Sequence, residues 1–155
     1  MRFERTVDFE LVRRILTHPD LYSRMGDDGS PPREQFRPNP HPDIWYVLAI
    51  EYECPAGLFV LVPENVITWQ IHVAMLPWAW GAIAQLAGRS ILPWVWEHTP
   101  CRRITASVLA GNRLAVQYGL RTLGLVQFGR DPQSFLKNGQ RQDRILMGRS
   151  HLCPV

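Results

Sequence analysis

The chain has 155 residues, of which 46% are hydrophobic and 20% are charged, and its formal net charge is +3. These proportions are those of an ordinary globular protein, so they argue against a disordered chain and against a fibrous repeat. The length fits one domain over residues 1–155, and no stretch approaches the roughly 18 consecutive apolar residues that a membrane span needs.

The N-terminus, the cysteines and the net charge indicate where the chain works and what it binds. Residues 1–10 carry charges where a signal peptide needs an apolar core, so we expect a cytoplasmic protein. The three cysteines show no CxxC spacing and the histidines show no ligand spacing, so we expect neither a disulfide framework nor a metal. The small positive charge favours an anionic ligand such as a nucleotide cofactor, but it is too weak for a dedicated nucleic-acid binder.

Helices and a loop are predicted in the first part of the chain. Asp8 precedes apolar residues at helical spacing, which predicts an N-capped helix over 9–17. Pro19 ends this helix and opens a short second one. The segment 26–43 is rich in proline and glycine and is predicted to be a long loop, either a surface insertion or a functional segment.

A three-stranded antiparallel meander is predicted next. Segments 45–52 and 58–62 are rich in β-branched and aromatic residues, and the residues between them suit a hairpin turn. The third strand, 66–75, alternates between apolar and polar side chains. Its polar strip consists of Thr68, Gln70 and His72.

Helices and strands alternate in the second half of the chain. A long amphipathic helix is predicted over 80–98, with Pro93 expected to kink or split it. The remaining elements are a strand at 104–108, a helix at 112–123 ended by Gly124, and strands at 125–128 and 144–147, separated by a polar segment around Asn138 and Gly139. The predicted order is β, α, α, three strands, α, β, α, β, β.

This order resembles that of the GNAT superfamily of acetyltransferases across most of the chain. The segment IHVAMLPWAWGAIA resembles the family's central strand and the loop that opens its cofactor helix, with Pro77 and Gly81 at the matching positions. The segment NRLAVQYGLRTLGL resembles the Asn-x-x-Ala helix that ends in Leu-Gly-Phe, with Asn112, Ala115 and Gly124 as the matches. RITASV resembles the strand that splays from the central one, and the tail around RILMGR is similar to small phage-encoded members.

The resemblance implies an α/β fold with a mixed, mostly antiparallel central sheet, flanked by helices and splayed at the cofactor site. It also implies an N-acetyltransferase that uses acetyl-CoA as co-substrate and transfers the acetyl group to an amine by direct attack. A helix N-terminus presents unpaired N–H groups and partial positive charge, which suits the cofactor's pyrophosphate. The expected cofactor-binding residues are Ala74, Met75, Trp80, Gly81, Ala82, Ile83, Ala84 and Asn112.

The cofactor loop departs from the family pattern at two positions. Trp80 stands where the family has arginine, and Ile83 stands where it has a second glycine. An isoleucine side chain obstructs the close backbone approach that glycine permits, so weakened cofactor binding is expected. Trp78 and Trp80 either pack under the loop, stack on the cofactor's adenine, or form a protein interface.

Two side chains are the candidate catalytic groups. His72 is the expected general base, since an imidazole titrates near neutral pH, and its alternative is a histidine on an exposed sheet face. Tyr118 resembles the family's proton-donating tyrosine, and its alternative is a core residue. The interval from Asn112 to Gly124 is one residue longer than usual, which predicts that Tyr118 is rotated by about 100° on its helix.

Other functions remain open on the sequence. The degenerate cofactor loop favours a non-catalytic protein of the same fold, for example a phage assembly or virion component with an aromatic interface, and such a protein would work in the host cytoplasm or in the virion. Modification of nucleic acid would need a stronger basic face than the sequence carries. Fold alone decides none of these functions.

Overall fold

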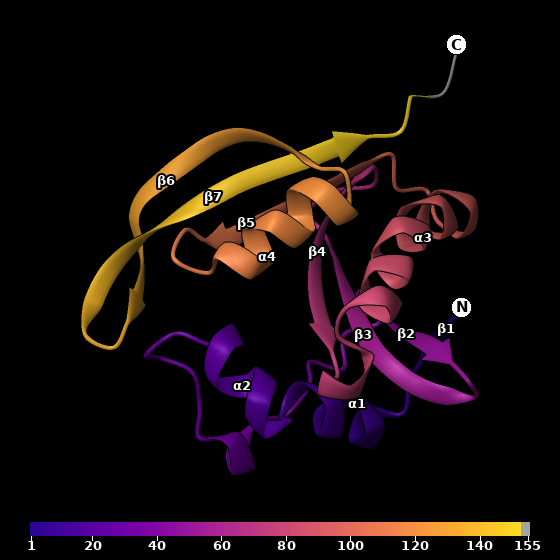
Figure 1. The fold of residues 1–155 in the computed structure, drawn as a ribbon, viewed down its shortest axis with the longest axis horizontal. Helices are drawn as coiled ribbons and strands as arrows, with labels where there is room; N and C mark the ends of the chain where they lie inside the picture. Colours follow the sequence, from indigo (N-terminus) through magenta and orange to yellow (C-terminus); the bar gives the residue numbers. More distant parts are fainter. Residues whose placement is uncertain (153–155) are drawn as a thin grey trace.

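A computed structural model describes residues 1–152 and builds them around one seven-stranded sheet of order β1-β2-β3-β4-β5-β7-β6 (Figure 1). The strands are β1 (Arg2–Thr6), β2 (Trp45–Glu51), β3 (Cys54–Pro63), β4 (Thr68–Met75), β5 (Arg103–Leu109), β6 (Val126–Lys137) and β7 (Gln140–Ser150). The helices are α1 (Phe9–Leu16), α2 (Pro19–Met25), α3 (Ala82–His98) and α4 (Arg113–Gln117), and η1 (Arg33–Gln35) and η2 (Pro77–Ala79) are short 3-10 turns. Within residues 1–152, β4 and β5 are the only strands that pair in parallel. The predicted element order and the mixed, mostly antiparallel sheet are confirmed.

Helices α1 and α2 begin where the sequence predicts. The Asp8 carboxylate accepts a hydrogen bond from the Leu11 N–H at 2.9 Å and so caps α1. Pro19 is the first residue of α2, where its missing N–H costs no helical hydrogen bond. Val12, Ile15 and Leu16 form the buried stripe of α1.

Two apolar clusters cover opposite faces of the sheet. Helices α1 and α2 pack on one face through a cluster that includes Val12 and Leu21 of the helices and Leu58 and Ala74 of the strands. Helix α3 and the segment after Asn112 pack on the other face in a larger cluster. The helix-side core of that cluster consists of Ala84, Ala87, Ile91, Leu92, Val95 and Leu123. Alternate residues of β4 therefore face different helices.

Pro93 does not split α3, which runs without a break from Ala82 to His98. A proline inside a helix removes one backbone hydrogen bond. Ile91, Leu92 and Val95, which flank the proline, are all buried against the sheet. This packing holds both parts of the helix in place, so of the two predicted effects of Pro93, a kink or a split, the split is wrong.

A π-helical turn (Tyr118–Thr122) follows α4 directly and absorbs the extra residue of this segment. The Leu123 N–H bonds to the Tyr118 carbonyl at 3.0 Å, an i to i+5 hydrogen bond. Gly124, with a φ of 68°, then ends the helical segment as predicted.

Strands β6 and β7 form a much longer hairpin than the sequence predicts. The segment predicted to be a polar connection belongs to the strands themselves, which pair out to Lys137 and Gln140. Asn138 and Gly139 make the turn with φ values of 52° and 70°, as a two-residue hairpin turn requires. Exposed polar strands lack the apolar alternation by which strands are predicted.

The hairpin tip is bonded to the loop that follows α2 (Figure 1). The Asp28 carboxylate accepts hydrogen bonds from the N–H groups of Asn138 and Gly139, at 2.7 and 2.8 Å. The Lys137 ammonium donates to the carbonyl oxygens of Ser23 and Gly26. The N-terminal part of the long 26–43 loop is thus held in place by a segment more than 100 residues away.

Candidate functional site

The two parallel strands at the centre of the sheet, β4 and β5, pair at one end only. The register joins Thr68 to Arg103, Trp69 to Ile104 and Gln70 to Thr105, and stops there. Beyond these residues β4 stays paired with β3, and β5 stays paired with β7. The central sheet therefore opens between β4 and β5, as expected for a splayed sheet.

Backbone groups of β4 line this opening in alternation. Just after the end of β4, the Leu76 N–H donates a hydrogen bond to the Ala56 carbonyl on the β3 side. Just before its start, the Ile67 carbonyl accepts hydrogen bonds from the N–H groups of Arg102 and Arg103 on the β5 side. Because backbone groups alternate along a strand, those of Val73 and Met75 face the opening. By the same alternation the backbone groups of Ala74 face β3, where Ala74 pairs with Leu58, and a cofactor role for Ala74 stays a prediction.

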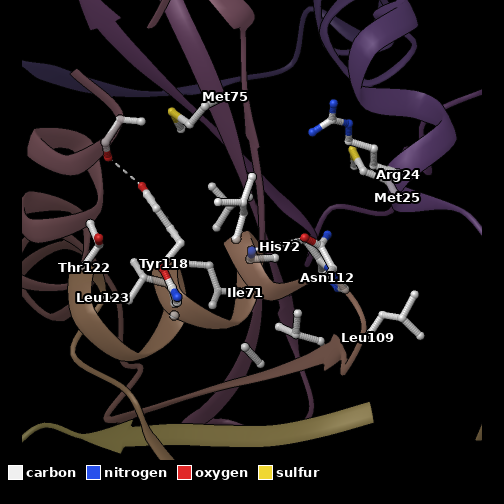
Figure 2. A pocket seen from close by; sticks show the side chains of 18 of the residues that line it. Arg24, Met25, Ile71, His72, Met75, Leu109, Asn112, Tyr118, Thr122 and Leu123 are labelled. Carbon is white, nitrogen blue, oxygen red and sulfur yellow. Dashed lines mark hydrogen bonds between the residues drawn. The ribbon is translucent and has the colours of Figure 1, made fainter. Parts of the chain in front are cut away.

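A cavity of about 900 Å³ runs through the opening between the two strands. Its wall includes Gln70 and His72 on the face covered by α1 and α2, and Ile71 and Met75 on the face covered by α3. Figure 2 shows His72 between two groups of side chains, with Tyr118, Thr122 and Leu123 on one side and Arg24, Met25 and Asn112 on the other. One cavity therefore connects both faces of the sheet.

His72 lies in the cavity wall and is exposed to solvent through it. The surrounding protein desolvates the ring, which disfavours the imidazolium and lowers the pKa of His72 below its ordinary value. A neutral imidazole at neutral pH accepts a proton. Gln70 shares this wall, whereas Thr68, the third member of the predicted polar strip, does not line the cavity.

Tyr118 also lines the cavity, but its hydroxyl points at helix α3 (Figure 2). The hydroxyl donates a hydrogen bond to the Ala84 carbonyl at 2.7 Å. Burial raises the pKa of Tyr118 above its ordinary value, so the phenol keeps its proton at neutral pH. A side chain at Gly88 would collide with this hydroxyl, because a Cβ there would lie 2.5 Å from it.

The loop before α3 brings Trp80 and Gly81 into the cavity wall. The Trp80 indole N–H donates to the Met75 carbonyl at 2.8 Å, and the ring is 46% exposed. Gly81 has a φ of 86°, a left-handed backbone that suits glycine, and caps α3 without a side-chain hydrogen bond. The first N–H groups of α3 therefore have no side-chain cap in the described part of the chain.

Some of the remaining predicted cofactor residues line the cavity and others do not. Ala84 lines the cavity, while Ala82 and Ile83 do not. Ile83 is half-buried and lies outside the cavity lining, and the expected obstruction by its side chain stays a prediction. Asn112 lines the cavity, and its side-chain oxygen caps α4 by accepting from the Ala115 N–H at 3.2 Å.

Arg24, Arg89 and Arg144 are residues of the cavity wall that the sequence did not predict, whereas Arg121 was a candidate to meet the cofactor phosphates. Arg24, Arg89, Arg121 and Arg144 line the cavity, and its lining within residues 1–152 includes no aspartate or glutamate. Arg144 is paired with Asp131 at 2.8 Å. The Arg24 guanidinium lies 5.4 Å from the centre of the Trp80 ring. Arg24 and Arg89 carry no sequence signal, because only the fold brings α2 and α3 to one cavity.

No group of three or more His, Cys, Asp or Glu side chains within residues 1–152 is arranged to hold a metal ion. No helix in the same part of the chain is long and apolar enough to cross a membrane.

Solved structures of acetyltransferases share this fold. Spermidine N-acetyltransferase from Vibrio cholerae, in complex with CoA and spermine, is 16% identical with a TM-score of 0.78, and the match covers 97% of this chain and 95% of that chain. Ribosomal-protein-alanine N-acetyltransferase from Brucella melitensis is 15% identical with a TM-score of 0.71, covering 97% of this chain and 99% of that chain. An acetyltransferase of the GNAT family from Streptococcus pneumoniae is 17% identical with a TM-score of 0.60, covering 71% of this chain and 68% of that chain. No protein-family model and no curated protein matches the sequence.

The chain therefore has the GNAT acetyltransferase fold over nearly its full length. At these identities the likeness defines the fold, and the function has to be argued from the cavity. The similarity of the tail to phage-encoded members stays a prediction.

Proposed function

We propose that this chain is an N-acetyltransferase that transfers an acetyl group from acetyl-CoA to an amine by direct attack. The observation that carries the proposal is the single cavity that passes between β4 and β5, with His72 in its wall. Such a cavity lets a cofactor enter from one face of the sheet and an amine from the other. A solved neighbour of this fold holds CoA, which supports the same cofactor here.

The residues on the α3 face fit CoA. Backbone groups of Val73 and Met75 would bind the amides of the pantetheine arm. The uncapped N–H groups that follow Gly81 would bind the pyrophosphate, which the helix dipole also favours. Arg89 and Arg121 add positive charge on this side of the cavity.

Two side chains of the cavity would move protons. Acetyl-CoA supplies an activated thioester carbonyl that an amine can attack. His72, neutral because its pKa is lowered, would take a proton from the acceptor's ammonium directly or through water. Tyr118 keeps its proton at neutral pH and would donate it to the leaving thiolate after releasing the Ala84 carbonyl.

Calorimetric titration with CoA and acetyl-CoA tests the cofactor half of this proposal. Ala115 lies half-buried in the cavity wall, so Ala115→Trp fills the cavity and abolishes the binding heat of the native chain. Leu86→Trp is the control, because Leu86 is exposed on α3 outside the cavity. Absence of heat from the native chain at millimolar CoA contradicts the proposal.

A second candidate is a non-catalytic protein of the same fold. Two groups at the cofactor face already have intramolecular partners, since Trp80 bonds to Met75 and Tyr118 bonds to Ala84. Trp78 is 47% exposed beside them and would serve as an interface anchor. A chain that binds no CoA but loses a partner in Trp78→Ala and Trp80→Ala would favour this candidate.

A further inference from the structure

The charges of the cavity wall are divided between the two faces of the sheet. Arg89 belongs to α3 and Arg121 to the π turn, on the face that we assign to the cofactor. Arg24 belongs to α2, whose Leu21 packs in the cluster on the opposite face. That face also carries His72, so Arg24 approaches the cavity from the side of the acceptor amine, and its guanidinium reaches the Trp80 ring of the cofactor face.

Arg24 is available for a ligand. Its side chain is exposed, and among residues 1–152 it has no hydrogen-bond or ion-pair partner. Trp80 contacts it only through the ring face, 5.4 Å from the guanidinium carbon. In Figure 2 its guanidinium extends from α2 into the cavity. By contrast, the Arg144 guanidinium is already paired with the Asp131 carboxylate.

Cations find no counter-charge in this cavity. A polyamine carries several ammonium groups, and each needs a carboxylate or an aromatic face to replace its water. No carboxylate lines the described part of the cavity. Of its aromatic rings, Trp80 already contacts Arg24, which leaves Tyr118 and Phe135. Without a carboxylate, the cavity is poorly suited to the several charges of a polyamine such as the spermine that the Vibrio cholerae neighbour holds.

We infer that the acceptor is a primary amine that also carries an anionic group, a carboxylate or a phosphate, which Arg24 binds. This inference rests on the proposed acetyl transfer and names its substrate class. A guanidinium binds either anion through two parallel hydrogen bonds, which would also orient the amine toward His72. Leu21, Met25 and Phe135 give the same end of the cavity apolar walls for the body of the acceptor.

Two matched pairs of amines, with spermidine, test the inference in an acetyl-transfer assay. L-Phenylalanine and 2-phenylethylamine differ by a carboxylate, and O-phosphoethanolamine and ethanolamine differ by a phosphate. We expect kcat/KM to be roughly 10- to 100-fold higher for the anionic member of at least one pair, with spermidine the poorest substrate. The pair in which the anionic member is preferred shows whether the site binds a carboxylate or a phosphate. Preference for spermidine or for both neutral amines would overturn the inference.

Arg24→Gln locates the anion site. It should remove the advantage of the anionic amine while leaving the KM for acetyl-CoA unchanged. Arg14→Gln removes the same charge from an exposed position of α1 outside the cavity and should change neither value. A raised KM for acetyl-CoA in Arg24→Gln, or an unchanged preference, would show that Arg24 does not bind the acceptor.

Direct binding separates this inference from the proposed function. If CoA gives no heat or no amine is acetylated, the proposed function fails. L-Phenylalanine and O-phosphoethanolamine are then titrated into the native chain and into Arg24→Gln. Binding that Arg24→Gln abolishes retains the anion site, whereas no binding of either anion overturns it.

Discussion

The Trp80 indole N–H donates a hydrogen bond to the Met75 carbonyl oxygen, 2.8 Å away, and thereby ties the loop before α3 to the end of β4. Met75 is the last residue of β4, where the strand has already separated from β5. The aromatic residue that replaces the expected arginine thus has a defined structural role. It also uses one of the backbone acceptors that face the cavity.

Trp80→Phe removes this donor and keeps an aromatic ring in the loop. Because a typical hydrogen bond contributes roughly 0.5–1.5 kcal/mol, the free energy of unfolding should fall by about that amount. Urea denaturation measures the difference. Trp78→Phe is the control, since Trp78 donates no side-chain hydrogen bond within residues 1–152 and should keep the native stability. Equal stability of both variants would mean that the loop is not held by the indole.

His72 governs the expected pH dependence of acetyl transfer. Only the neutral ring accepts a proton, so the rate should rise with pH and reach half its maximum below roughly pH 6.5, because the pKa of His72 is lowered. At neutral pH, His72→Ala should reduce kcat by about 10²- to 10⁴-fold with little change in CoA affinity. His41→Ala, on the exposed loop, provides the control. A flat pH profile would contradict the assignment of His72 as the base.

Gly88 and Tyr118 should be coupled in stability. A Cβ at position 88 would lie 2.5 Å from the Tyr118 hydroxyl and 2.6 Å from the Thr122 methyl group. Gly88→Ala should therefore destabilise the chain by about 1–3 kcal/mol, although alanine favours helix. Tyr118→Phe removes the hydroxyl and should cancel part of this loss in the double variant, as a double-mutant cycle by urea denaturation would measure. Strict additivity would show that the contact does not exist in solution.

Ile83→Gly separates the sequence expectation from the structure. The sequence predicts that glycine at this position opens the cofactor loop and tightens CoA binding. Because Ile83 does not line the cavity, we expect unchanged CoA affinity and a loss of roughly 0.5–1 kcal/mol in stability from lower helix propensity. Calorimetry and urea denaturation check the two values. Tighter CoA binding would restore the original expectation.

Asp28 should control the exchange of amide hydrogens at the hairpin tip. Asp28→Ala removes the acceptor for the Asn138 and Gly139 N–H groups, so both amides should exchange faster with solvent. Hydrogen–deuterium exchange followed by mass spectrometry resolves this segment. Glu4→Ala, an exposed carboxylate on β1, should leave exchange at the tip unchanged. An exchange rate in Asp28→Ala equal to that of the native chain would show that these Asp28 hydrogen bonds do not form in solution.

Local sequence patterns determined the element order and most element positions of this protein. Asp8, Pro19 and Gly124 mark helix boundaries through backbone chemistry that acts within a few residues. A run of β-branched and aromatic residues located β2, and apolar alternation located β4. The outer part of the long hairpin of β6 and β7 was not predicted, because its side chains are mostly exposed and so show no apolar alternation.

Only the tertiary structure decided what lines the cavity. Arg24, Val73, Arg89 and Tyr118 meet there because three helices and a splayed strand converge, and no spacing along the chain encodes that convergence. The tertiary structure also decides that backbone groups of Val73, and not those of Ala74, face the opening, because this depends on which β4 residues bond to β3. Sequence patterns report local periodicity and backbone chemistry. The charge and shape of a site depend on side chains brought together from distant segments.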